Sequence, residues 1–182
     1  MFNFFKKSSP KIKVVDKVWM SPEAKWKACS QMQSENPDCL FVAWFTDTSD
    51  EGTPWINAEF EGKPTFCLAD DPAVGRAQGR TIIFVEHHPL VSKEQKLFQT
   101  LGLEEVTVLS SLSEPLFQHF GGTDVIALMK QLGMKDDDVI EHSMASSSIS
   151  KAQKKIEKTI KVERSARTLS EWFKINGFGD RK

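Results

Sequence analysis

The sequence predicts an α/β fold in which a parallel sheet is flanked by helices and followed by a C-terminal helical extension. Apolar, strand-like runs alternate with helical segments as far as about residue 113, and such alternation is typical of parallel sheets. From Glu114 onward the pattern is helical. The 182 residues and the 40% hydrophobic content are enough for one domain with a substantial core and an extension.

Five segments are predicted as strands. Lys11 to Met20 alternates toward apolar residues, whereas the other four are short and mostly apolar, as expected of strands covered on both faces. These four segments are Cys39–Phe45, Thr65–Ala69, Thr81–Val85 and Glu105–Leu109.

The first helices are predicted from their start and stop signals. Ser21-Pro22-Glu23 provides an N-cap, a first-turn proline and an early acid, and these start a helix that runs to about Ser34. Residues 46–64 are polar and contain two glycines and two prolines, so we expect a loop with one helical turn inside it. Further helical segments are expected over 72–78 and 93–101.

The C-terminal part contains an amphipathic helix, predicted from about Ser143 to about Ile160. Ile149, Ala152 and Ile156 recur at helical spacing on one face, which should dock across the α/β domain. Residues 168–171 form a Thr-x-x-Glu capping box that is able to restart a helix, so the terminal helix either runs on or kinks there.

A specific residue pattern coincides with this helix and the turn before it. Ile-x-His-x-Met is followed by Ile-x-x-Ala-Gln-x-x-Ile-Glu, and this resembles the segment by which SecA preprotein translocase ATPases leave their second nucleotide-binding domain and enter the long scaffold helix. The matching residues are Ile140, His142, Met144, Ile149, Ala152, Gln153, Ile156 and Glu157. Upstream, Ser111–Gly121 and Ile126–Gly133 look like two further stretches of the family, and Glu86 with His88 is similar to its E-x-H turn.

The resemblance covers roughly Thr81 to Glu157 and implies a RecA-like fold, similar to the second domain of a P-loop-type ATPase. It divides the chain into a flexible N-terminus (1–10), an α/β nucleotide-binding-type domain (11–133) and a helical extension (134–182). That extension resembles the start of the scaffold helix. The family uses ATP to thread preproteins through a membrane channel.

The motifs for ATP chemistry are missing. A RecA-type second domain stabilises the transferring phosphoryl group with arginines, whereas the similar stretch here, Gln95–Glu104, contains none, and lysine lacks the planar two-pronged donor. The one Gly-Lys pair, Gly62-Lys63, is followed by proline where a phosphate loop needs Ser or Thr. We therefore expect a degenerate fold with no catalytic residue, no cofactor and no metal ion.

Composition limits the location and the partners. Cys29, Cys39 and Cys67 are odd in number and widely spaced, which favours buried free thiols in a reducing cytoplasm. No apolar run approaches the roughly 18 residues of a membrane-spanning helix, and Met1–Lys7 lacks the apolar core of a signal peptide. The net charge of -1 indicates no general attraction to nucleic acid or anionic lipid.

The leading hypothesis is a non-catalytic binding or regulatory protein that acts through its basic C-terminal helix. A truncated scaffold helix should leave apolar side chains uncovered among the basic ones, available to another protein or to a second copy of this chain. The predicted partner-binding residues are Lys154, Lys155, Lys158, Lys161, Arg164, Arg167, Leu169, Trp172 and Phe173.

Two alternatives stay open. A small cytosolic enzyme would need a pocket lined by Glu86, His88 and Arg80, although neighbouring residues on an extended strand point in opposite directions, so that at most one of His87 and His88 faces it. An RNA-binding module is disfavoured because no aromatic residue is interleaved with the basic residues before Trp172.

We predict that the purified protein neither hydrolyses ATP nor binds it with useful affinity, because both the phosphate loop and the arginine motif are missing. Calorimetric titration with ATP and magnesium should show no micromolar binding. A micromolar dissociation constant would contradict this interpretation.

Overall fold

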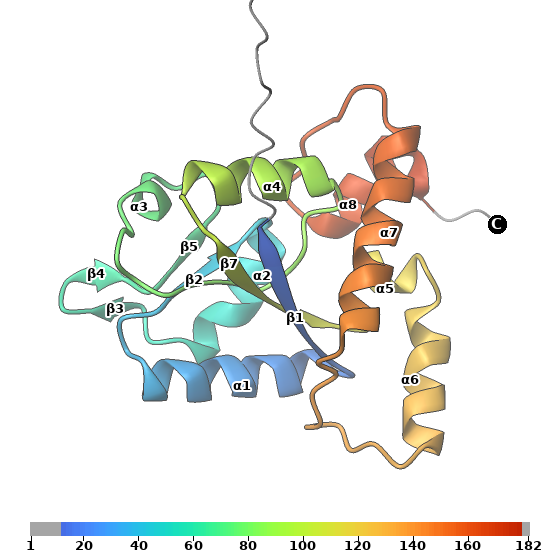
Figure 1. Ribbon diagram of the computed structural model, residues 1–182, viewed down its shortest axis with the longest axis horizontal. Coiled ribbons are helices and arrows are strands. Elements are labelled where there is room, and N and C mark those ends of the chain that lie inside the picture. The colour runs from blue at the N-terminus through green and yellow to red at the C-terminus, as the bar shows by residue number, and fades with distance from the viewer. Residues whose placement is uncertain (1–11, 180–182) are drawn as a thin grey trace, which may run out of the picture.

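The computed structural model describes residues 12–179. Its centre is a five-stranded sheet with the order β1-β7-β6-β2-β5, in which every neighbouring pair is parallel (Figure 1). The strands are β1 (Lys13–Trp19), β2 (Leu40–Ala43), β5 (Phe66–Leu68), β6 (Ile82–Phe84) and β7 (Glu105–Ser111). Each overlaps a segment predicted as a strand, so the parallel sheet is confirmed. The predicted flexible N-terminus, 1–10, lies outside the described residues.

Helices cover both faces of the sheet. Below it in Figure 1 lies α1 (Pro22–Glu35), and above it lies α4 (Val91–Thr100). Trp26 of α1 packs in one cluster with Phe41 of β2, whereas Phe98 of α4 packs in another cluster with Val42 of the same strand. Because successive side chains of a strand point to opposite faces, the sheet serves two hydrophobic cores.

The connections that leave β2 and β6 lead to opposite sides of the sheet, although the two strands are parallel neighbours. After β2 the chain continues to β5 at one edge of the sheet, but after β6 it continues to β7 on the other side. Neighbouring parallel strands whose connections diverge leave a crevice at their carboxyl ends, where open α/β sheets commonly bind ligands. The residues that follow β2 and β6 are therefore placed where a ligand site is expected.

The segment from 46 to 64 is more ordered than predicted. It contains α2 (Thr46–Gly52), the short 3-10 helix η1 (Thr53–Trp55) and a hairpin of β3 (Glu59–Phe60) and β4 (Lys63–Pro64). A Cβ atom on Gly52 would lie 2.5 Å from the indole of Trp26. The polar composition of α2 indicated a loop, but close packing against α1 holds the helix in place.

The C-terminal part is not one continuous run of helix, and that expectation was wrong. Residues 132–142 and 160–168 are non-helical, and Ile140 pairs with Val18 of β1. Thr168 caps the last helix by accepting a hydrogen bond from Glu171 N, so the predicted restart is confirmed. The elements are α3 (Pro72–Gly75), α5 (Pro115–Gln118), α6 (Gly122–Gln131), α7 (Ser143–Thr159), α8 (Leu169–Phe173) and η2 (Lys174–Phe178).

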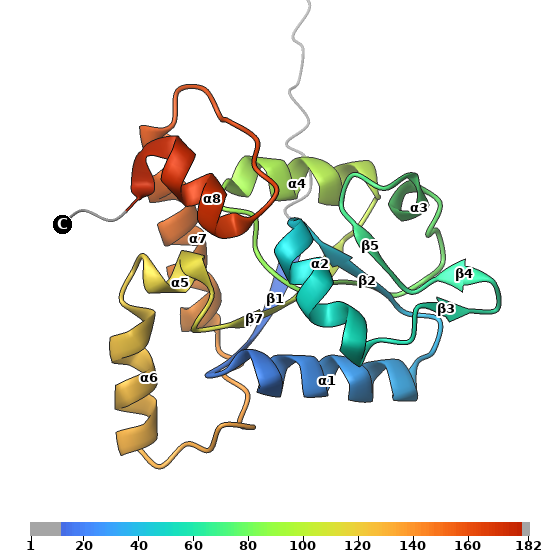
Figure 2. The ribbon, with the colours of Figure 1, turned by 180° about the vertical axis from the view of Figure 1, so that it is seen from behind.

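The inward face of α7 agrees with the prediction. Ile149 and Ile156 are buried and Ala152 is half-buried. Gln153 is buried as well, which the sequence pattern did not indicate, and its side-chain NH2 donates to His88 O at 2.8 Å. Figures 1 and 2 both place the end of the chain, α8 and η2, beside the upper part of α7.

We predict that Ile156→Ala lowers the unfolding free energy by about 2 to 5 kcal/mol, because the side chain is 1% exposed and its loss leaves a cavity. The melting temperature of a chain of this size should then fall by roughly 4 °C or more. Lys154→Ala on the exposed face is the matched control and should melt like the parent. Equal melting of the two variants would contradict the placement of α7.

Candidate functional site

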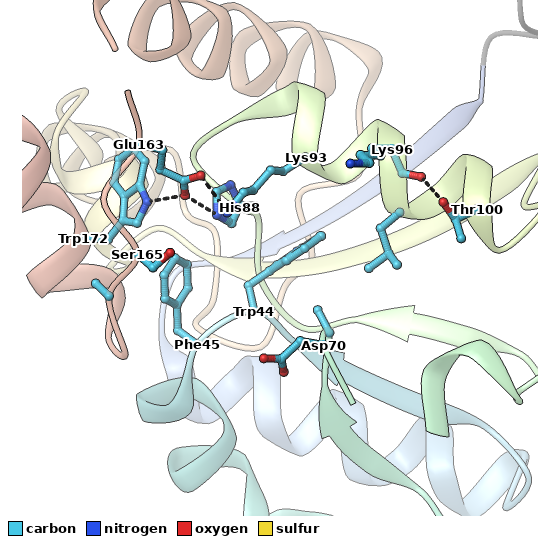
Figure 3. A pocket seen from close by; sticks show the side chains of 13 residues that line it. Trp44, Phe45, Asp70, His88, Lys93, Lys96, Thr100, Glu163, Ser165 and Trp172 are labelled. Atoms are coloured by element: carbon cyan, nitrogen blue, oxygen red, sulfur yellow. Dashed lines mark hydrogen bonds and ion pairs between the residues drawn. The ribbon is translucent and has the colours of Figure 1, made fainter. Parts of the chain in front are cut away.

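A crevice lies at the carboxyl ends of the strands, where β2 and β6 diverge. It has a volume of about 420 Å³ (Figure 3). Trp44 and Phe45 follow β2, Asp70 follows β5 and His88 follows β6, while Lys93 and Lys96 come from α4. Glu163 and Trp172 reach it from the C-terminal segment. This is the position that the topology indicates for a ligand.

The imidazole of His88 is enclosed by aromatic rings. It stacks on Phe45 with 5.6 Å between ring centroids, and it meets Trp44 and Trp172 edge-on at 5.2 and 5.9 Å. Its Nδ1 accepts from Leu90 N at 3.0 Å, so the proton of the neutral ring sits on Nε2, which faces Glu163 at 3.4 Å. The imidazole of His88 therefore takes the space between these three aromatic rings in the wall of the crevice.

Glu163 is the carboxylate of the crevice that contacts His88. Its carboxylate accepts from Trp172 Nε1 at 2.9 Å and pairs with Lys93 Nζ at 2.7 Å, besides its contact with His88. Burial alone would raise the pKa of Glu163, but hydrogen bonds from His88, Lys93 and Trp172 lower it to about 2. The donors that converge here are thus engaged by a carboxylate from the segment after α7, as the dashed lines in Figure 3 show.

The enzyme site predicted at Glu86, His88 and Arg80 is not assembled. Glu86 accepts hydrogen bonds from Trp44 N, Phe45 N and Thr48 Oγ1 beneath the crevice, and burial raises its pKa to about 8. Arg80 precedes β6, at the opposite end of the strand, where its guanidinium donates to the carbonyl oxygens of residues 38, 39 and 64. Of the three, only His88 lines the crevice.

His87 points away from His88, as the alternation of an extended segment requires. Its two ring nitrogens lie 2.8 Å from Asp16 Oδ1 and 2.9 Å from Glu94 Oε1, and all three side chains are buried. Burial alone would lower the pKa of His87, but the two carboxylates raise it to about 10. The group is a buried imidazolium that ties β1 and α4 to the end of β6.

Several other features bear on the chemistry. Within residues 12–179, no group of three or more His, Cys, Asp or Glu side chains is arranged to hold a metal ion. Cys29, Cys39 and Cys67 are buried free thiols, as predicted. Burial raises the pKa of Cys29 and of Cys67 to about 12, so neither is a ready nucleophile.

No helix in the described part of the chain is long and apolar enough to cross a membrane.

The predicted partner-binding residues fall into two groups. The basic residues are exposed: Lys154, Lys155 and Lys158 on α7, and Lys161, Arg164 and Arg167 after it. The apolar residues Leu169, Trp172 and Phe173 are only 2%, 1% and 6% exposed, so their expected exposure was wrong. They pack with Phe45, Leu90 and Ile156 because residues 160–168 turn the chain back to the sheet.

We predict that the buried imidazolium makes stability fall with rising pH. A raised histidine pKa contributes stability that is complete below the unfolded value of about 6.5 and is lost as pH rises toward about 10. The unfolding free energy from urea titrations should therefore drop by more than about 1 kcal/mol over this range. His87→Gln should flatten the dependence of the unfolding free energy on pH, whereas the control His142→Gln removes an exposed imidazole and should keep that dependence.

NMR of the parent should find His87 still protonated at pH 8, and a neutral ring there would refute the assignment.

Comparison with known proteins finds similarity to protein translocase subunit SecA from several bacteria. SecA 1 of Chlorobium chlorochromatii is 34% identical over 115 residues, which is 61% of this chain and 11% of that protein. SecA of Acinetobacter baumannii is 47% identical over 92 residues, and SecA of Chlorobaculum tepidum is 38% identical over 90. These cover 48% and 47% of this chain. No family model matches the chain.

The chain spans only about a tenth of the length of these relatives, since the shares of their sequences are 11%, 10% and 9%. Their identities are high enough over about half of this chain to show a common origin for that part. Together with the five-stranded parallel sheet, they identify the chain as SecA-like over roughly half its length, with an α/β fold of the RecA type.

Proposed function

We propose that this chain is a non-catalytic binding or regulatory protein, related to a segment of SecA, that binds an acidic surface of a partner protein. The contact surface is the basic stripe of α7, formed by Lys151, Lys154, Lys155 and Lys158. The observation that carries the proposal is the arrangement of these four side chains. At about 100° per residue they fall within an arc of roughly 100° on the helix, opposite the buried Ile149 and Ile156.

The basic stripe carries uncompensated charge. All four lysines are exposed, and none takes part in an ion pair within residues 12–179. The one acid in this stretch of α7, Glu157, accepts hydrogen bonds from the backbone and hydroxyl of Ser92 instead. An acidic partner would find four unpaired ammonium groups held in one row by a rigid helix, which favours fast and specific association.

Three features support a non-catalytic role. The Gly62-Lys63 pair forms the tip and second strand of the β3–β4 hairpin rather than a loop before a helix, and Gly62 has a φ of +73° in that turn. Gln95–Glu104 supplies no arginine to the crevice. The carboxylate of Glu163 lines the crevice and neutralises the charge of Lys93. The buried free thiols support a reducing, cytoplasmic location.

The partner is able to be a second copy of this chain, in which case the proposal needs no other protein. The three consecutive acids Asp136–Asp138 are exposed on the loop after α6 and carry the opposite charge, and two of them pair with lysines of the same chain, Asp136 with Lys130 and Asp137 with Lys27. Self-association and binding of another protein would use the same basic stripe, so one set of variants tests both.

We predict that reversing the charge of the basic stripe abolishes partner binding without unfolding the chain. The variant changes Lys151, Lys154, Lys155 and Lys158 to glutamate, and the tagged protein serves as bait in cytosol from the source organism. Proteins retained by the parent should elute at high salt, because screening weakens contacts between exposed charges. The variant should lose them and should also lose any dimer detected by light scattering.

The matched control reverses four exposed basic residues elsewhere, Lys63, Arg76, Lys135 and Lys174. It carries the same net charge as the stripe variant and should keep the partners. If both variants bind like the parent, or both lose binding equally, the basic stripe is not the contact surface.

A further inference from the structure

An apolar groove lies beside the basic stripe, between α6 and α7. Its volume is about 430 Å³, and we call it the α6–α7 groove. Its walls include Phe120, Val125 and Met129 from α6 and the turn before it, and Met144, Ile149 and Ala152 from α7. It is separate from the crevice at the strand ends, with which it shares no lining residue.

The apolar surface of this region is only partly covered. Seven large apolar side chains are strongly exposed within residues 12–179, and five of them lie between the turn before α6 and the first turn of α7. Leu128 is 51% exposed, Leu132 70% and Met144 71%, whereas Gly122 is the one buried residue of α6. Of these five side chains, Phe120 and Met144 line the groove itself. Exposed apolar side chains that adjoin an apolar groove mark a binding surface more often than single exposed ones do.

The groove and the basic stripe are neighbouring sides of one helix. On α7, Met144, Ala152 and Ile149 cover an arc of roughly 140° that overlaps the edge of the lysine arc by about 20°, because Met144 lies between Lys151 and Lys155 around the helix. Lys155 Nζ lies 5.7 Å from the ring centroid of Phe120, so this ammonium stands at the rim of the groove. The site therefore combines an apolar channel with a row of positive charge along one side.

We propose that the α6–α7 groove receives an amphipathic helix of a partner protein, with its apolar face in the groove and acidic residues along the flank that meets the basic stripe. A channel between two helices suits a third helix, which buries side chains at i, i+3, i+4 and i+7. Met129 and Met144 are flexible side chains that adapt to the shape of such a ligand. The inference rests on the proposed function and specifies the chemistry of its partner.

The test uses the full chain and a designed probe. A fluorescein-labelled peptide of about 18 residues, or roughly five helical turns, carries leucine at helical spacing and glutamate along one flank. A second peptide has the same composition in an order that does not form an apolar face. Fluorescence anisotropy should detect salt-sensitive binding of the first peptide and at least about tenfold weaker binding of the second.

Two single variants distinguish peptide binding in the groove from non-specific binding elsewhere on the surface. Met144→Glu places a charge in the groove at a side chain that is 71% exposed, and Val162→Glu makes the same change at a side chain that is 82% exposed and outside the groove. Both should melt like the parent. Met144→Glu should weaken peptide binding at least about tenfold, whereas Val162→Glu should change it less than twofold.

The outcomes separate this inference from the proposed function. If reversal of the basic stripe removes partner binding but Met144→Glu leaves both the partner and the peptide bound, the groove proposal is overturned and the stripe alone is the site. If the amphipathic peptide binds no better than the reordered one, the proposal also fails. If the chain dimerises and Met144→Glu abolishes the dimer, the occupant is a second copy and the acidic partner helix is wrong.

Discussion

The buried segment that follows β6 sets the positions of most other elements. Residues 83–90, which include the end of β6, are all buried, and backbone polar groups away from water must be hydrogen-bonded. Lys25 of α1 donates to Val85 O, Glu94 of α4 accepts from His88 N, and Gln153 of α7 donates to His88 O. Three helices from distant parts of the sequence are thus held at a few consecutive residues. Leaving one such buried group without a partner costs about 1 to 3 kcal/mol, so each helix is constrained to place a polar side chain there.

The parts of the fold that could be predicted are those that local patterns determine. Continuous apolar runs located β2 and β6, and the spacing of Ile149 and Ile156 located the inward face of α7. The burial of Lys25 and Gln153 was missed because the carbonyl groups to which they donate lie 60 and 65 positions away, so both look like ordinary surface residues of polar helices. The short helix α2 was missed for the same kind of reason, since its order depends on Trp26 and Glu86 rather than on its own sequence.

The candidate site was predictable only in part. Glu86 and His88 were singled out correctly as a pair at the end of a strand, but the Glu163 carboxylate that reaches His88 comes from the other end of the chain. Likeness to a protein with a long scaffold helix suggested that Leu169 and Trp172 would be left uncovered. Instead α7 ends at Thr159, and the following segment returns to the carboxyl ends of the strands. There Glu163 pairs with Lys93, and Trp172 packs edge-on against His88. Lys154, Lys155 and Lys158, which were predicted as contact residues from composition and helical spacing alone, are exposed.

The return of the C-terminal segment to the strand ends has a consequence for biosynthesis. Thr46, just after β2, donates through both its backbone N and its Oγ1 to Arg167 O, and Trp172 covers the crevice that Trp44 and Phe45 line. A ribosome adds roughly 5 to 20 residues per second, so on the order of ten seconds separates the emergence of these early residues from that of Trp172. Throughout that interval the strand ends present bare aromatic rings in the nascent chain. Chaperones that bind exposed apolar segments would therefore meet this edge of the sheet before the C-terminal segment covers it.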